Sequence, residues 1–132
     1  MKTLLRLPSE MSKKPLIAEI ILETEARINI DRANVGAVGG ETVLDVPDDK
    51  YENVVAFFKS KGVETVLLTK PILLDEDKCL HCGACVSICP TEVFGLEDDW
   101  HLGLDAVKCI QCSACITACL FGALSLSEDN LE

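Results

Sequence analysis

The chain repeats one cysteine pattern, and this repeat constrains its fold more than any other feature. The segment KCLHCGACVSICPTEVF (residues 78–94) aligns with KCIQCSACITACLFGAL (residues 108–124) at a shift of 30 residues, with every cysteine matched. Each copy has the spacing C-x-x-C-x-x-C-x-x-x-C. Two copies of one unit predict two equivalent sites.

The spacing indicates metal ligation. Three cysteines at intervals of three can wrap a loop around one compact cluster, while the fourth emerges on a short helical turn that points away. Zinc is the alternative, but its C-x-x-C pairs rarely need a third cysteine at the same interval, so the doubled pattern favours iron and sulfide. Small residues between the cysteines let backbone N–H groups approach a cluster closely. They are Gly83, Ala84, Ser113 and Ala114.

A disulfide framework is the other alternative. The 132 residues, 48% of them hydrophobic, suffice for one ordinary domain or two small ones. No apolar run approaches the length of a membrane span, and the segment MKTLLRLPSEMSKK lacks the features of a secretory signal. We therefore expect a cytoplasmic protein without a membrane partner, in which eight thiols are metal ligands rather than disulfides.

Charge divides the chain near Pro71. Residues 1–71 hold ten Lys and Arg against eleven Asp and Glu, a net charge of −1, whereas residues 72–132 hold two against eleven, a net charge of −9. An acidic surface argues against nucleic-acid binding, which needs clustered Lys and Arg. It favours docking on a basic protein surface, and solubility alone is the alternative interpretation.

Residues 1–71 show strand and helix patterns in turn. The predicted strands are residues 2–8, 26–38, 41–46 and 63–69. We expect Gly39 and Gly40 to form a two-residue hairpin turn, because glycine tolerates the positive φ angles of such turns. The apolar alternation slips phase between Ile30 and Ala33, which predicts a β-bulge near Arg32.

Two helices complete this part. Ser12 is a candidate cap for the first, with Pro15 in its first turn. Asp49 and Glu52 resemble a capping box for the second, which Gly62 ends. The order β-α-β-β-α-β predicts an α+β fold, an antiparallel sheet with both helices on one face. The segment GAVGG lacks the spacing and the following helix of a phosphate loop, so we expect no nucleotide site there.

Two histidines and the tryptophan lie near the cysteines. His81 falls inside the first cysteine loop, and Trp100 and His101 lie between the two copies. We expect His81 to be a solvated loop residue rather than a ligand. Trp100 and His101 are expected in a surface turn rather than in a redox role.

The region from Ile72 to Leu126 resembles the two-cluster bacterial ferredoxins, with all eight cysteines in place. In that spacing the fourth cysteine of each copy ligates the other cluster. The resemblance implies two [4Fe-4S] clusters in a pseudo-twofold ferredoxin domain, residues 72–132, that carries single electrons at low potential. The implied ligands are Cys79, Cys82, Cys85 and Cys119 for the first cluster and Cys109, Cys112, Cys115 and Cys89 for the second. Leu120 stands where the family pattern has proline, and ligation should survive because proline is not a ligand.

Residues 1–71 resemble the NIL domain, a βαββαβ module found at the end of methionine-transporter ATPases and fused to ferredoxins in anaerobes. The segment INIDRANVGAVGGETVLDV stands in place of the stretch that gives the family its Asn-Ile-Leu name. This chain reads Asn34-Val35-Gly36 there. The resemblance implies two domains that meet between residues 71 and 72.

A NIL domain followed by a two-cluster ferredoxin resembles the ferredoxin subunit of the system that makes homocysteine from aspartate semialdehyde in methanogens and some anaerobic bacteria. The resemblance implies an electron-transfer subunit without catalytic residues of its own. Its implied partners are a sulfur-delivering sulfurtransferase subunit and an upstream low-potential electron donor. Two alternatives stay open: a redox or methionine-responsive sensor, and a general-purpose ferredoxin. Methionine binding with a shift in melting temperature would identify the sensor.

Overall fold

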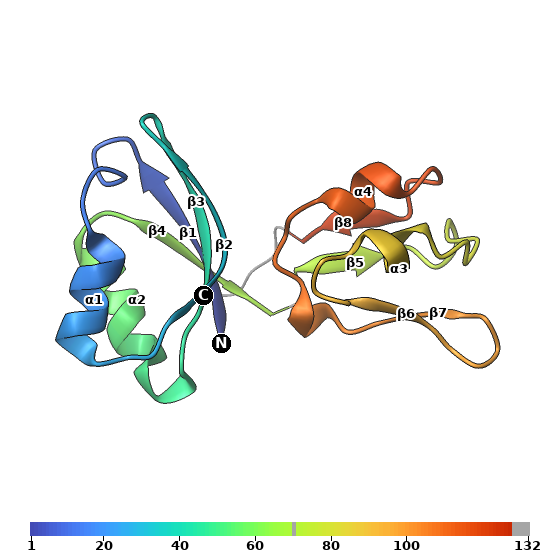
Figure 1. Cartoon of the computed structure of the whole chain (residues 1–132), viewed down its shortest axis with the longest axis horizontal. Coiled ribbons are helices and arrows are strands. Elements are labelled where there is room, and N and C mark those ends of the chain that lie inside the picture. Colours follow the sequence, from blue (N-terminus) through green and yellow to red (C-terminus); the bar gives the residue numbers. More distant parts are fainter. Residues whose placement is uncertain (70, 128–132) are drawn as a thin grey trace. The chain divides into compact units, whose positions relative to one another are not determined.

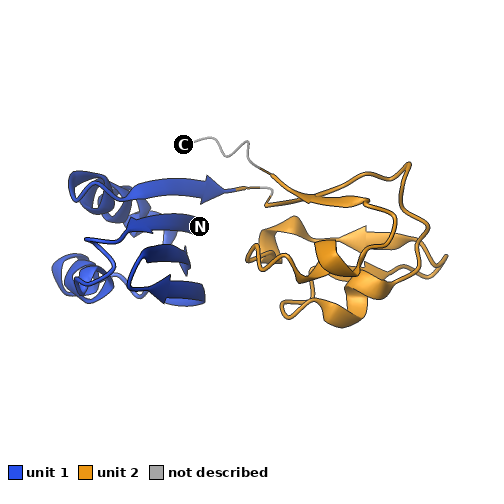
Figure 2. Ribbon diagram, turned by 90° about the horizontal axis from the view of Figure 1, so that it is seen from above, with its two compact units in different colours: residues 1–68, 131–132 blue, residues 69–130 orange. Residues whose placement is uncertain are grey.

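The computed structural model describes residues 1–69 and 71–127. The chain forms two compact units that divide between Leu68 and Thr69, close to the change in charge at Pro71 (Figure 2). Both units combine helices with antiparallel strands, which confirms the predicted α+β class. None of the helices in the described residues has both the length and the apolar character that a membrane crossing requires.

The first unit is a four-stranded antiparallel sheet with two helices packed on it. Its elements are β1 (Lys2–Pro8), α1 (Leu16–Thr24), β2 (Asn29–Gly36), β3 (Gly39–Asp45), the 3₁₀ helix η1 (Asp48–Lys50), α2 (Tyr51–Ser60) and β4 (Glu64–Leu68). The strand order is β2-β3-β1-β4, so the first strand of the chain lies inside the sheet. Figure 1 shows both helices on the same face of this sheet.

The core of the first unit lies between the helices and the sheet. Leu16 and Ile20 of α1 are buried, as are Val54 and Phe58 of α2. A spacing of four residues places each pair on one face of its helix. They pack with the fully buried Leu44 of β3 in one apolar cluster.

The turn between β2 and β3 differs from the prediction. It consists of Ala37 and Val38, whereas Gly39 and Gly40 belong to β3. A Cβ atom on Gly39 would lie 2.6 Å from the carbonyl oxygen of Leu7 in β1, and one on Gly40 would collide with the backbone of β2. Both glycines permit close packing of neighbouring strands, and Gly39, which directly follows the turn, also has the expected positive φ of 112.

Two other local predictions in this unit are confirmed. The register of β2 against β3 shifts between Ile30 and Arg32, which is the expected bulge. Helix α2 ends at Ser60, and Gly62 follows it with φ 78, the left-handed conformation that terminates many helices.

Both predicted helix caps are wrong. The Ser12 hydroxyl donates to the carbonyl oxygen of Ser9 at 2.9 Å, and α1 begins only after Pro15. Asp49 lies inside η1, whose last residue, Lys50, is the cap position of α2, and no side chain caps that helix. In each case a local turn before the helix uses the residue that the pattern assigned to the cap.

The second unit consists of two copies of a strand–helix–strand motif, one after the other in the chain. Its elements are β5 (Ile72–Leu74), α3 (Ala84–Ile88), β6 (Phe94–Leu96), β7 (Leu102–Leu104), the 3₁₀ helix η2 (Ala106–Lys108), α4 (Ala114–Ala118) and β8 (Leu124–Leu126). β5 pairs with β8 and β6 pairs with β7, both antiparallel. Each small sheet therefore takes one strand from each copy, so neither copy can complete its pairing alone.

Thiols form a large part of the core of the second unit. Its buried members are Ile72, Cys85, Val93, Phe94, Cys109, Cys115 and Leu124, and Cys89 and Cys119 pack against them. With so few large apolar side chains, this unit should depend on metal ligation for much of its cohesion.

Candidate iron-sulfur site

Each cysteine loop leads into a short helix. The loop between β5 and α3 carries Cys79 and Cys82, α3 carries Cys85, and Cys89 directly follows the helix. The second copy repeats this arrangement around α4 with Cys109, Cys112, Cys115 and Cys119. In both copies the helix carries the third cysteine, and the fourth directly follows the helix.

Left-handed backbone turns direct amide groups at the first cysteine of each loop. His81 has φ 55 and Gln111 has φ 56. Their N–H groups donate to the Sγ atoms of Cys79 at 3.4 Å and Cys109 at 3.3 Å. Such hydrogen bonds stabilise negative charge on sulfur, as a metal-bound thiolate requires.

The fourth cysteine of each copy also accepts a backbone hydrogen bond. The N–H of Val93 donates to Cys89 Sγ at 3.4 Å, and the N–H of Ala123 donates to Cys119 Sγ at 3.4 Å. Burial would raise the pKa of Cys89, but hydrogen bonds from Val93 and from the segment around Thr91 together lower it. The pKa of Cys119 is lowered mainly by the Ala123 N–H. Both sulfurs are thus prepared to carry negative charge.

The third cysteines lie in drier, more crowded surroundings. Burial raises the pKa of the Cys85 thiol, and the nearby Cys79 and Cys82 raise it further. Burial raises the pKa of Cys115 to about 11, with added repulsion from Cys109, Cys112 and Cys89. Thiols in such a group cannot all ionise together unless a cation offsets their charge.

These features fit a cluster of iron and sulfide. Such clusters are held by cysteine thiolates and tuned by hydrogen bonds to sulfur and by burial, and both are present here. Within residues 1–69 and 71–127, no three Cys, His, Asp or Glu side chains form a group that could hold a single metal ion.

His81 makes contacts that its position in the sequence did not indicate. Its Nδ1 atom accepts a hydrogen bond from the N–H of Leu102 at 3.0 Å, and its ring lies 4.7 Å from that of His101 between centroids. Instead of being a freely solvated loop residue, His81 links the first cysteine loop to β7 of the other copy. Trp100 and His101 are exposed in the turn between β6 and β7, as expected.

Comparison with known proteins identifies the same two cysteine segments. Residues 72–94 and residues 108–122 each match a family model described as a 4Fe-4S binding domain. Ferredoxin-2 of Desulfomicrobium norvegicum is 48% identical over 27 residues, which cover 20% of this chain and 46% of that protein. The C-terminal domain of an ABC transporter ATP-binding protein from Enterococcus faecalis has a TM-score of 0.42 and 20% identity, covering 52% of this chain and 82% of that chain.

Two relatives match far more of the chain. The L-aspartate semialdehyde sulfurtransferase iron-sulfur subunit of Methanosarcina acetivorans is 44% identical over 128 residues, 97% of this chain and 98% of the relative. The subunit of the same name from Methanocaldococcus jannaschii is 34% identical over 95 residues, 71% of this chain and 72% of the relative. With two 4Fe-4S binding segments and eight cysteines in ferredoxin spacing, the chain binds two [4Fe-4S] clusters. It belongs to the family of L-aspartate semialdehyde sulfurtransferase iron-sulfur subunits.

Proposed function

We propose that this protein is the electron-carrying subunit of a cytoplasmic sulfurtransferase system that forms homocysteine from aspartate semialdehyde. One observation carries the proposal: the similarity to the Methanosarcina subunit extends over 97% of this chain and thus over both units. Similarity of the cluster-binding part alone, as with Ferredoxin-2 over 27 residues, would support only a general ferredoxin. Each [4Fe-4S] cluster transfers one electron, so two clusters together can provide the two electrons of a two-electron reduction.

The ligand assignment is part of this proposal. Cys79, Cys82, Cys85 and Cys119 hold the first cluster, and Cys109, Cys112, Cys115 and Cys89 hold the second. Cys89 raises the pKa of Cys115, as Cys109 and Cys112 do, which supports Cys89 as the fourth ligand of the second cluster. The shift of 30 residues between the copies and the pairing of strands across them support a pseudo-twofold arrangement, in which Cys119 has the reciprocal role.

Residues 1–71 are assigned as a NIL domain, and residues 72–132 as the ferredoxin domain. The order β1-α1-β2-β3-α2-β4 and the strand order β2-β3-β1-β4 support the first assignment. In this assembly the NIL domain positions the electron carrier on its partner rather than taking part in chemistry.

The partners are a sulfur-delivering subunit and an upstream low-potential electron donor. The net charge of −9 on residues 72–132 supports docking on basic protein surfaces. All eight cysteines are assigned as cluster ligands, so none is left as a sulfur-transferring nucleophile. We therefore assign the chain as a non-catalytic subunit.

A growth experiment tests the function. In a strain that holds the sulfur-delivering partner but lacks other routes to homocysteine and methionine, deletion of this protein should abolish growth without either compound. Re-expression should restore growth, and Cys82→Ser or Cys112→Ser should fail to restore it while the first unit stays folded. Growth of the deletion strain without supplements would refute the assignment and favour a general-purpose ferredoxin.

A methionine-responsive sensor is a second candidate, favoured by a cavity in the first unit. The cavity has a volume of about 210 Å³ and is lined mainly by apolar residues of α1 and of the sheet. Thr42 lines it, is 1% exposed, and its Oγ1 atom has no hydrogen-bond partner in the described part of the chain. An unsatisfied buried hydroxyl would gain from a polar ligand group.

Thermal unfolding distinguishes the sensor from the carrier. A sensor should be stabilised by methionine or homocysteine, by about 2.7 kcal/mol at a hundredfold excess over Kd. Thr42→Val, which removes the hydroxyl, should reduce that shift. An unchanged melting temperature of the first unit with both compounds would exclude the sensor, and the carrier predicts this result.

A further inference from the structure

The two cysteine loops have unequal surroundings although their sequences are copies. Leu80 in the first loop is 65% exposed, whereas its counterpart Ile110 is 8% exposed. Cys79 is half-buried and Cys109 is buried. The middle cysteines of both loops are exposed, so the difference is concentrated at the first cysteine and the two residues after it.

The Gln111 side chain bonds the second loop to Pro71, a residue of the same unit, and this contact covers the loop. Its side chain is buried, and its Nε2 atom donates to the carbonyl oxygen of Pro71 at 3.2 Å. The N–H of Ser127 donates to the same oxygen at 3.2 Å. In the first loop the equivalent residue, His81, is covered by the exposed ring of His101 instead. The first loop is therefore the more accessible of the two.

A hollow of about 570 Å³ lies beside the first loop. Four exposed carboxylates and two histidines line it: Glu76, Asp77, Glu97, Asp99, His81 and His101. Trp100, which lies between two of these residues in the chain, is 74% exposed. The hollow itself is therefore acidic, and the exposed residues Leu80 and Trp100 are each next in the chain to residues that line it.

The second loop has no matching set of charges at the equivalent positions that the structure describes. The counterparts of Glu76, Asp77 and Glu97 are the uncharged Ala106, Val107 and Ser127, and the counterpart of His101 is Pro71. The counterpart of Asp99 is Asp129, which lies outside the described residues. Three of the four carboxylates beside the first loop therefore have uncharged counterparts, while the net charge of the domain acts on both loops. Lys78, the charged residue before Cys79, is engaged with Asp75 at 3.9 Å and does not line the hollow.

We propose that the surface formed by Leu80, Trp100, Glu76, Asp77, Glu97 and Asp99, here called the Leu80–Trp100 surface, is where a protein partner docks. The occupant is a protein face that presents an apolar side chain within a ring of Lys and Arg. The two exposed apolar side chains suit the apolar contacts of such an interface, and the four exposed carboxylates suit its Lys and Arg. The proposal rests on the assigned role as an electron carrier, and it adds which of the two cysteine loops faces the partner.

A peptide of four lysines around a central leucine serves as the probe. The full-length protein with both clusters is labelled with 5-fluorotryptophan, and the chain's single tryptophan, Trp100, then gives one ¹⁹F signal on the proposed surface. At an ionic strength of about 0.1 M, where charges act over only about 10 Å, the peptide should shift this signal in a saturable way. A peptide of four glutamates around leucine should have no effect, and one with serine at the centre should bind more weakly.

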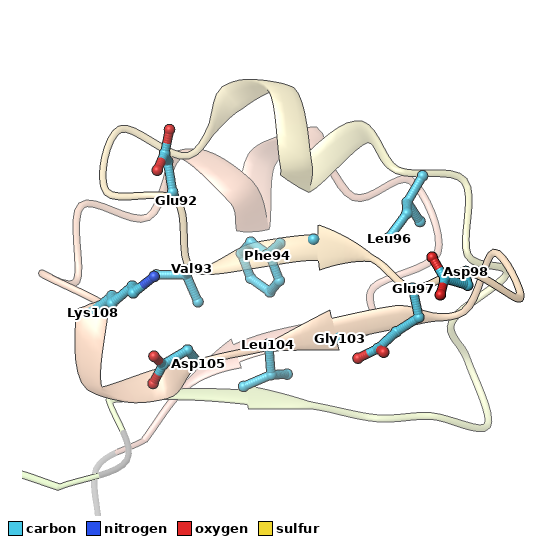
Figure 3. A pocket seen from close by; sticks show the side chains of 11 residues that line it. Glu92, Val93, Phe94, Leu96, Glu97, Asp98, Gly103, Leu104, Asp105 and Lys108 are labelled. Atoms are coloured by element: carbon cyan, nitrogen blue, oxygen red, sulfur yellow. The ribbon is translucent and has the colours of Figure 1, made fainter.

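Two double variants with the same change in net charge test the location. Glu76→Gln with Asp77→Asn removes two charges from the hollow. Glu92→Gln with Asp105→Asn removes two from a second hollow, of about 490 Å³, on the β6–β7 hairpin, where Figure 3 shows Asp105 and Lys108 at one end and Glu97 and Asp98 at the other. The first pair should weaken peptide binding about fivefold and the control pair less than twofold, because Coulomb attraction falls with distance. All four residues are exposed, so cluster absorbance and circular dichroism should not change.

Equal weakening by the two pairs would show that only the total charge matters and would overturn the proposal. Stronger weakening by the control pair, or an equal response to the acidic peptide, would also overturn it. These results leave the growth experiment unaffected. A failure of the docking surface is therefore distinguishable from a failure of the proposed function.

Discussion

Replacing Phe58 with alanine should strongly destabilise the first unit and leave the cluster-binding unit intact. Phe58 is 0% exposed, lies in the core between α2 and the sheet, and packs edge to face with Phe57 at 5.5 Å between ring centroids. Loss of a fully buried phenylalanine side chain costs about 3–5 kcal/mol. At about 0.05–0.15 kcal/mol per residue, a unit of this size has a total stability of about 3–10 kcal/mol. The substitution thus removes a large part, or all, of the stability of the first unit.

Two optical signals separate the units. Helices α1 and α2 have 9 and 10 residues, whereas α3 and α4 have 5 each, so far-ultraviolet circular dichroism mainly reports the first unit. Visible absorbance of the clusters reports the second. In Phe58→Ala the dichroism should be lost at a temperature at least 10 °C lower, at about 4–8 °C per kcal/mol, with the bleaching temperature of the clusters unchanged. Leu22→Ala, at a site on α1 that is 81% exposed, is the control and should change neither signal. Parallel loss of both signals in Phe58→Ala would refute the independence of the units.

Three further predictions concern the clusters and the partner. Cys119→Ser should damage the cluster held by Cys79, Cys82 and Cys85 and spare the other, as read by electron paramagnetic resonance and iron content; damage to the other cluster would contradict the exchange of fourth ligands. Removal of iron by a chelator should collapse amide-exchange protection in the second unit alone, since its core is rich in thiols, and equal collapse in both units would argue against this. Trp100→Ser should reduce growth rescue at an unchanged protein level, whereas Leu22→Ser, at another exposed site, should not; full rescue by Trp100→Ser would count against the Leu80–Trp100 surface.

Local patterns predicted features whose cause is local. The bulge near Arg32 follows from a slip in the alternation of apolar residues, and the end of α2 follows from the freedom of Gly62 at positive φ. The helix caps failed because local turns before each helix use Ser12 and Asp49, whereas the β2–β3 turn failed for a reason that is not local. Gly39 and Gly40 are required by strands β1 and β2, which lie close only in the folded sheet, so their role could not be read from neighbouring residues.

The contacts of His81 show the same limit at the site. Its hydrogen-bond partner, Leu102, is 21 residues away in the chain. Nothing in the sequence of the cysteine loop indicates that these two residues lie together in the folded protein. The pairing of β6 with β7 brings the second copy beside the first loop, and only then can the imidazole accept the Leu102 N–H.

The amino-acid sequence alone was sufficient to predict the two-part organisation, the cluster chemistry of the eight thiols and the acidic character of the second part. Ligand spacing and charge are properties of short segments, so they can be interpreted without knowledge of the folded structure. Only the tertiary structure decided that each small sheet takes a strand from both copies and that two copied loops differ in exposure. Exposure depends on what distant residues cover: Gln111 is buried through its bond to Pro71, 40 residues earlier, while Leu80 in the matching loop faces solvent.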